Sequence, residues 1–233
     1  NGKKYLNSLK KGLINSKNDK ELFLSIYDNW KNYSANQNNK FFFKYLVEKT
    51  PLNELYIDII RRWFNDAKII YIVRDPRDNY VSYRKKNLNS TFNNYIYSWK
   101  KSVKAILSVN QKNILIIKYE DLVTNLELHT KKIEEFLNIN FEETILKPTR
   151  NGLPWGGNSM FNSNSSKVHK IALGRYKNKL NAEEIEEIEM HLFDELNYFS
   201  YPVDYANSKK KLPLYFKYIQ NTKLYIKNMV IRY

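Results

Sequence analysis

A strand that runs directly into a helix, over residues 68–83, constrains the fold of this chain more than any other stretch. Ile69–Val73 is a short, nearly continuous apolar and β-branched run, which is typical of a strand buried on both faces. Asp75 can cap the following helix, Pro76 suits its first position, and Asp78 stands where an acid completes a capping box. The pattern therefore predicts a strand, a tight turn and a helix.

This arrangement places two polar side chains where ligands bind in open α/β sheets. Arg74 leaves the carboxyl end of the predicted strand, and Ser82 lies in the first two turns of the predicted helix. A guanidinium, a hydroxyl and a helix N-terminus that converge there would hold a phosphate or a similar anion. From spacing alone, the alternative is an ordinary surface turn in which Ser82 is only a small helical residue.

Two further strands are expected on either side of this unit. Phe41–Val47 reads as a buried strand, and Thr50 and Pro51 would then cap and open a helix over Leu52–Asn65. The order strand, helix, strand implies a parallel pair with a right-handed crossover. Residues 113–118 read as a third strand of the same kind, so we expect an α/β fold with a parallel sheet.

Helices fill most of the remaining sequence. Apolar residues recur at helical spacing near the N-terminus, and Tyr33–Asn39 looks like the loop that ends this part. The other predicted helices cover 92–109, the stretch that follows Tyr119–Leu122 and runs to Leu137, and a segment that Asn181 and Glu184 begin with a capping box. Residues 139–179 are rich in loop-forming residues.

Composition sets outer limits on the function. The formal charge of +15 would attract an anionic substrate, a nucleotide or a membrane surface, although a coding bias toward Lys, Asn, Ile and Tyr explains it equally well. The absence of cysteine excludes disulfides and thiolate metal sites and favours a reducing compartment, so we expect a cytoplasmic protein. The 3 histidines lie far apart and match no ligand pattern, so no metal is expected.

The run Arg-Asp-Pro-Arg-Asp followed by Val-Ser-Tyr resembles the 3′-phosphate-binding segment of sulfotransferases that use 3′-phosphoadenosine 5′-phosphosulfate (PAPS). In that family the arginine and the serine eight residues later bind the 3′-phosphate, and here these residues are Arg74 and Ser82. Glu48-Lys49-Thr50-Pro51 resembles the motif of the carbohydrate-type and bacterial branches whose lysine lies near the transferring sulfuryl group. The resemblance implies that Lys49 stabilises negative charge at the reacting centre, and the alternative is a solvated lysine at a strand end.

Two later segments resemble the same family in the right order. Tyr119-Glu-Asp-Leu after a strand is similar to the segment whose tyrosine packs near the adenine. Trp155–Met160 and Gly174–Lys177 are similar to the late segment in which a mobile loop with serine and basic residues closes over the nucleotide. Tyr119 is thus a predicted nucleotide contact. Arg175 and Lys177 are further candidates, together with Lys167 and Lys170.

The sequence departs from the family at its N-terminal end. Family members carry a Gly-rich loop with Lys, Ser or Thr at their first strand, which cradles the 5′-phosphosulfate, and residues 1–40 contain no such loop. The resemblance therefore covers 41–201 and lacks the first strand and the P-loop. Glu21 and Glu48 are candidates for the catalytic base by residue type alone. We expect a fragment, and the alternative is a protein that no longer runs the reaction.

The resemblance implies a single α/β domain over residues 1–206, with a P-loop-like parallel sheet and helices on both faces. The expected reaction moves a sulfuryl group from PAPS to a hydroxyl or amine of a small molecule or carbohydrate, without a metal and without a nucleic acid partner. The alternatives are another P-loop-type nucleotide-dependent transferase, such as a kinase, and a non-catalytic basic module that binds anionic polymers.

The basic amphipathic segment 207–233 would dock on its own domain, contact a partner or lie on a membrane as a peripheral helix. A missing N-terminal segment would make a Golgi or membrane-associated location the alternative to the cytoplasm.

Overall fold

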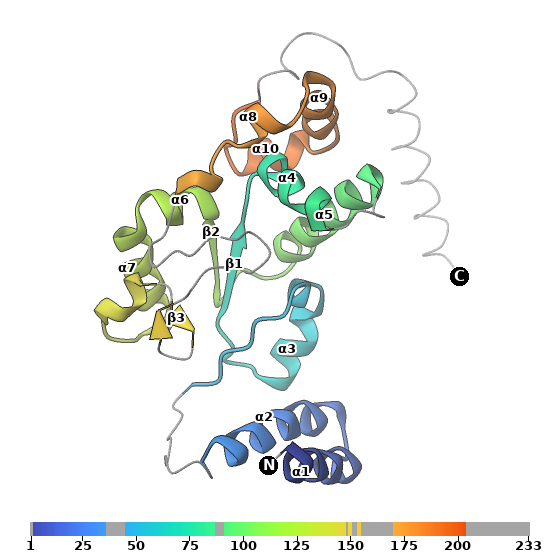
Figure 1. Ribbon diagram of the computed structural model, residues 1–233, viewed down its shortest axis with the longest axis vertical. Coiled ribbons are helices and arrows are strands. Elements are labelled where there is room, and N and C mark those ends of the chain that lie inside the picture. Colours follow the sequence, from blue (N-terminus) through green and yellow to red (C-terminus); the bar gives the residue numbers. More distant parts are fainter. Residues whose placement is uncertain are drawn as a thin grey trace. The chain divides into compact units, whose positions relative to one another are not determined.

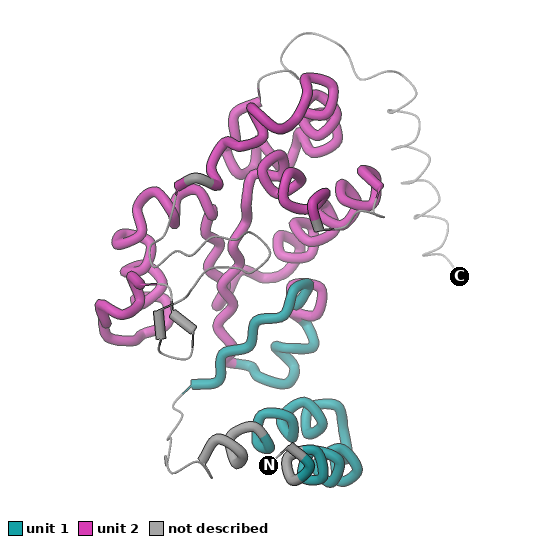
Figure 2. The backbone as a smooth tube through the Cα atoms, in the orientation of Figure 1, with its two compact units in different colours: residues 1–53, 58–65 teal, residues 54–57, 66–233 magenta. Residues whose placement is uncertain are grey.

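The computed structural model describes residues 2–35, 45–86, 91–147, 149–150, 153–154 and 170–203. They form two compact units, one of residues 1–53 and 58–65 and the other of residues 54–57 and 66–233 (Figure 2). The single domain predicted over 1–206 stays a prediction, and the predicted segment 207–233 lies outside the described residues.

The first unit begins with two helices, α1 (Gly2–Asn15) and α2 (Asp19–Ala35), which pack against each other. They approach closely at Gly12, where an added Cβ would lie 2.8 Å from the side-chain amide of Asn29. The predicted helical character of this part is confirmed. The loop expected from Tyr33 onward is wrong for its first residues, because α2 continues to Ala35.

The strand expected over 41–47 is not found in its described part. Residues 41–44 lie outside the described residues, and 45–50 have no regular secondary structure. Tyr45, Leu46 and Val47 are all more than half exposed. Strand preference reflects packing on a half-buried, pleated surface, and the described residues of this unit contain no strand with which these residues can pair.

The predicted helix 52–65 begins later than expected. The Glu48 carboxylate accepts hydrogen bonds from the Thr50 hydroxyl and the Asn53 side chain, which closes a turn at Pro51. Leu52 has φ 74°, a left-handed conformation that cannot be part of a helix. A 3₁₀ turn, η1 (Asn53–Tyr56), therefore comes first and leads into α3 (Ile57–Trp63).

The second unit is built on a parallel pair of strands, β1 (Ile69–Val73) and β2 (Ile114–Lys118) (Figure 1). Their register runs from Ile69 opposite Ile114 to Val73 opposite Lys118. Two helices connect them, α4 (Pro76–Lys86) and α5 (Phe92–Leu107). The predicted strands at 69–73 and 113–118 are confirmed, but the expectation that the first strand is buried on both faces is wrong, because Ile72 is half exposed and only Val73 is fully buried. The residues that follow the two strands emerge at the same edge of the sheet.

The core of this unit lies between the sheet and its helices. The helix predicted over 92–109 forms as α5, and its residues Tyr95, Trp99 and Val103 are buried. It packs in one cluster with residues of α9 (Ala182–His191) and α10 (Phe193–Tyr198). The capping box predicted for Asn181 and Glu184 is present at the start of α9.

The segments after β2 are shorter than predicted. One helix was expected up to Leu137, and the chain instead forms α6 (Tyr119–Thr124) and α7 (Leu126–Leu137), which meet at Asn125. The described residues of the loop-rich part that follows form short elements: η2 (Glu143–Leu146), β3 (Thr149–Arg150) paired antiparallel with β4 (Leu153–Pro154), η4 (Lys170–Ala172) and α8 (Tyr176–Lys179). A helix with the length and apolarity needed to cross a bilayer is not found in the described part of the chain.

Candidate functional site

Arg74 emerges at the carboxyl edge of the sheet, as predicted, and its guanidinium has two contacts there. Its Nη2 donates to the backbone oxygen of Ala172 at 2.7 Å. Its Cζ lies 4.8 Å from the ring centroid of Tyr119, the first residue after β2, which is a favourable cation–π distance. The two predicted nucleotide contacts Arg74 and Tyr119 therefore lie against each other.

Ser82 meets the same part of the chain from the second turn of α4. Its Oγ accepts a hydrogen bond of 2.8 Å from Nη2 of Arg175. Ala172 and Arg175 belong to one short stretch, the 172–176 segment, which connects η4 to α8. Arg74 and Ser82 thus contact one segment about a hundred residues later in the sequence, and we call Arg74, Ser82 and Arg175 the arginine cluster.

The turn between β1 and α4 is capped differently from the prediction. Asp75 does cap α4, because its Oδ1 accepts from the Arg77 amide at 2.9 Å. Asp78 does not complete a capping box, since the Asp75 amide donates instead to Oε1 of Glu120 at 3.0 Å. The capping-box prediction for Asp78 is therefore wrong, and its carboxylate is used elsewhere.

Asp78 binds the 172–176 segment through two backbone amides. Its Oδ2 accepts from Gly174 at 2.6 Å, and its Oδ1 accepts from Tyr176 at 2.9 Å. Residues 74, 78 and 82 therefore all contact the same segment, the last two from one face of α4 at a spacing of one helical turn.

Arg77 is a structural residue inside this turn. Its side chain is fully buried, with Nη2 2.7 Å from Asp75 and Nη1 2.5 Å from Glu189. Its Cζ lies 4.3 Å from the ring centroid of Tyr176. Burial alone would lower the pKa of Arg77, but the hydrogen bonds and charge of Asp75 outweigh it and raise the pKa. Arg77 thus stays charged and neutralises the buried carboxylates of this region.

Both arginines of the cluster have charges and hydrogen-bond donors that the described residues do not pair. Within the described part of the chain, neither Arg74 nor Arg175 forms an ion pair with a carboxylate. The Nε atom of each is buried and has no hydrogen-bond partner among the described residues. Buried donors without a partner are rare in folded proteins. Two guanidinium groups and a hydroxyl around one segment fit an anion that offers several oxygen acceptors.

The other predicted site residues lie apart from these contacts. Lys49 is exposed and belongs to the first unit, so its place at the reacting centre stays a prediction. Lys177 is also exposed, with Nζ 6.0 Å from the ring centroid of Tyr176. Lys170 is exposed in η4, and Lys167 lies outside the described residues.

Both carboxylates named as possible bases serve as local caps. Glu21 accepts from the Lys17 amide at 2.8 Å and from the Asn18 side chain at 3.0 Å. Glu48 binds Thr50 and Asn53. These contacts give both residues a structural role.

The sequence prediction missed the roles of Asp78 and Glu120 and the burial of Arg77. The two acids hold backbone amides from other parts of the chain. One signal was available: residues 74–78 contain four charged residues directly after the apolar run 69–73, which is more charge than a solvated turn requires. Their partners, far away in the sequence, gave no local signal.

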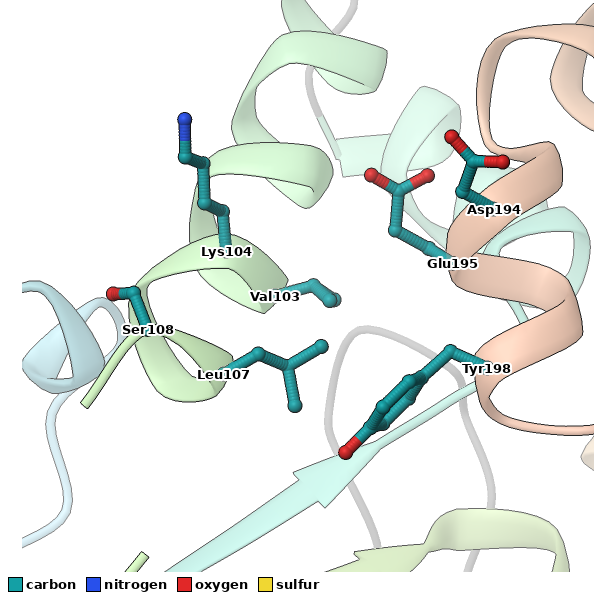
Figure 3. A pocket seen from close by; sticks show the side chains of 7 residues that line it. All are labelled: Val103, Lys104, Leu107, Ser108, Asp194, Glu195 and Tyr198. Atoms are coloured by element: carbon teal, nitrogen blue, oxygen red, sulfur yellow. The ribbon is translucent and has the colours of Figure 1, made fainter. Parts of the chain in front are cut away.

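A pocket of about 370 Å³ lies elsewhere in the second unit, between α5 and α10 (Figure 3). Val103 and Leu107 of α5 line it from one side, and Glu195 and Tyr198 of α10 from the other. None of the predicted site residues lines this pocket. The described residues contain no group of three or more His, Asp or Glu that could hold a metal ion.

Comparisons with known proteins give a family match and two structural likenesses. The model of the sulfotransferase family matches residues 5–143, more than half of the chain. A search of curated proteins gave no match. Among solved structures, a sulfotransferase domain from the curacin biosynthetic pathway has 22% identity and a TM-score of 0.52, with 86% of this chain and 78% of that domain covered.

A second solved structure is the sulfotransferase domain from the Synechococcus PCC 7002 olefin synthase. It has 20% identity and a TM-score of 0.58, with 84% of this chain and 76% of that domain covered. These likenesses confirm the predicted fold class, an α/β fold of the P-loop-like kind. The family match over residues 5–143 shows, in addition, that the chain belongs to the sulfotransferase family.

Proposed function

We propose that the chain moves a sulfuryl group from PAPS to a hydroxyl or amine on a small molecule or carbohydrate. One observation carries this proposal beyond the family: Arg74 and Ser82 both contact the 172–176 segment, where Arg175 adds a second guanidinium. The buried Nε atoms of both arginines lack partners among the described residues, so the cluster can accept an anion.

The arginine cluster would hold the 3′-phosphate of the nucleotide. Guanidinium groups present paired donors that match phosphate oxygens. The Ser82 hydroxyl accepts from Arg175 and can donate its own hydrogen to a further acceptor. The Tyr119 ring, in contact with Arg74, would lie beside the adenine.

PAPS supplies the sulfuryl group and, as leaving group, a phosphate on which negative charge develops. In this proposal Lys49 supplies positive charge where that negative charge builds up, which lowers the barrier without a metal. The arginine cluster fixes the nucleotide through its 3′-phosphate, so that the acceptor and the sulfuryl group meet in line.

Calorimetry with 3′,5′-ADP and 5′-AMP tests the site assignment, since the two nucleotides differ by the 3′-phosphate. The Arg74→Ala variant should bind 3′,5′-ADP roughly 10- to 100-fold more weakly, because a charge-assisted hydrogen bond contributes about 1.5–3 kcal/mol. Its affinity for 5′-AMP should change little. Arg84→Ala is the matched control, since Arg84 lies on the same helix and its guanidinium is paired with Glu184.

The assignment fails if Arg74→Ala lowers the affinity for both nucleotides equally, or if the wild-type chain binds neither. A requirement for Mg²⁺ would point to a kinase-like transferase. Strongly salt-dependent polymer binding that Ser82→Ala leaves unchanged would point to a non-catalytic module.

A further inference from the structure

Asp78 holds the 172–176 segment at the two amides that flank Arg175. Asp78 is 1% exposed, and its carboxylate accepts from the Gly174 amide on one side and the Tyr176 amide on the other. These bonds span 96 and 98 residues of sequence, so they fix a distant part of the chain against α4.

The backbone of this segment is shaped to receive a carboxylate. Gly174 has φ +66° and Arg175 has φ −61° and ψ −24°, so a left-handed residue is followed by a right-handed one. Such a pair turns successive amides toward the same side and forms a concave anion site. A Cβ at Gly174 would meet nothing within 4 Å, so the conformation and not the available space favours glycine here.

With both neighbours fixed, the side chain of Arg175 is directed along α4. Its guanidinium reaches Ser82, which lies one helical turn after Asp78 on the same face. We infer that Asp78 is a positioning residue: by binding the amides of Gly174 and Tyr176 it places the Arg175 guanidinium against Ser82. The role in nucleotide binding rests on the proposed function of the arginine cluster.

A purely structural role for Asp78 makes a different prediction. If the carboxylate only holds α8 on α4, its loss destabilises the fold and weakens every ligand alike. If it positions Arg175, removing the carboxylate lowers the affinity only for nucleotides that carry a 3′-phosphate. This decrease in affinity disappears once Arg175 has been removed.

The test uses the full chain and three variants: Asp78→Asn, Arg175→Ala and the double variant. An asparagine keeps the shape but turns an NH₂ group toward one of the two amides. We expect Asp78→Asn to lower the affinity for 3′,5′-ADP roughly 10-fold and the affinity for 5′-AMP less than about 2-fold. In the Arg175→Ala background, Asp78→Asn should lower the affinity for 3′,5′-ADP by less than about 2-fold. Equal losses for both nucleotides, or independent effects in the double variant, would overturn the inference.

Amide hydrogen exchange provides a readout that needs no nucleotide. Exchange at Gly174 and Tyr176 should be faster in Asp78→Asn than in the wild type, and unchanged in Asp194→Asn, which alters an exposed acid on α10. Unchanged exchange in Asp78→Asn overturns the positioning role by itself. A wild-type chain that binds neither nucleotide contradicts the proposed function, whereas faster exchange in that case still supports the placement of Arg175 by Asp78.

Discussion

Two arginines three residues apart in the β1–α4 turn have opposite environments. Arg77 is fully buried between Asp75 and Glu189, and its charge is compensated. Arg74 is half-buried, with one bond to a backbone oxygen and no ion pair in the described part of the chain. The first holds the turn together, and the second remains able to bind an anion.

Removal of the Arg77 side chain should lower the stability of the second unit. Arg77→Ala leaves the carboxylates of Asp75 and Glu189 buried without their cation, which typically lowers the free energy of unfolding by about 3–5 kcal/mol. Urea denaturation followed by circular dichroism measures the change.

The control for this experiment is Arg84→Ala. The Arg84–Glu184 pair is about one-third exposed, so its loss should cost about 1 kcal/mol or less. Equal losses in the two arginine variants would show that the buried pairs of Arg77 do not stabilise the turn.

The sequence allowed the positions of Arg74 and Ser82 to be predicted, because a strand end and a helix start are set by neighbouring residues. The contact between Ser82 and Arg175 joins residues 93 positions apart, and no local pattern encodes it. Asp78 shows the same limit: its spacing fitted a capping box, but Glu120, from another element, binds the Asp75 amide.

At the scale of elements, local signals succeeded where a partner was close in sequence or the pattern was long. The strands β1 and β2, the helix α5 and the capping box of α9 were all predicted. The expected strand at 41–47 failed over Tyr45–Val47, because the sequence pattern could not tell whether a neighbouring strand was available.

Three elements of the second unit are joined by one chain of hydrogen bonds. Tyr71 of β1 and Ser102 of α5 have their oxygens 2.9 Å apart, and Ser102 donates to Glu54 of η1 at 2.6 Å. Burial is the main reason that the pKa of Tyr71 is raised to about 12; the hydrogen bond with Ser102 lowers it and the charge of Glu54 raises it.

This pKa predicts a loss of stability in alkaline solution. The Tyr71 phenol should ionise near pH 10 in the unfolded chain and near 12 in the folded one. The contribution of Tyr71 to the free energy of unfolding is therefore complete below pH 10 and is lost as the pH rises from 10 toward 12.

Tyr71→Phe should remove this contribution. Between pH 10 and 12 its free energy of unfolding should fall less steeply than that of the wild type, by up to about 1.4 kcal/mol per pH unit. Tyr97→Phe changes an exposed ring on α5 and should keep the wild-type slope. Denaturant unfolding across this pH range decides the matter, and parallel curves for wild type and Tyr71→Phe would contradict the prediction.

At the scale of the whole molecule, the arginine cluster lies within one compact unit and yet combines distant parts of the chain. Arg74 and Ser82 fall inside the stretch that matches the sulfotransferase family, residues 5–143, whereas Arg175 lies beyond it. Asp78 connects the two parts, because it lies inside the matched stretch and binds the segment outside it.

The most direct measurement is a crystal structure of the full chain with 3′,5′-ADP. We expect the 3′-phosphate to lie within hydrogen-bond distance of the Arg74 guanidinium and the Ser82 hydroxyl, with Arg175 beside it. A 3′-phosphate bound away from Arg74 and Ser82 would contradict the proposed nucleotide site and leave only the family and the fold.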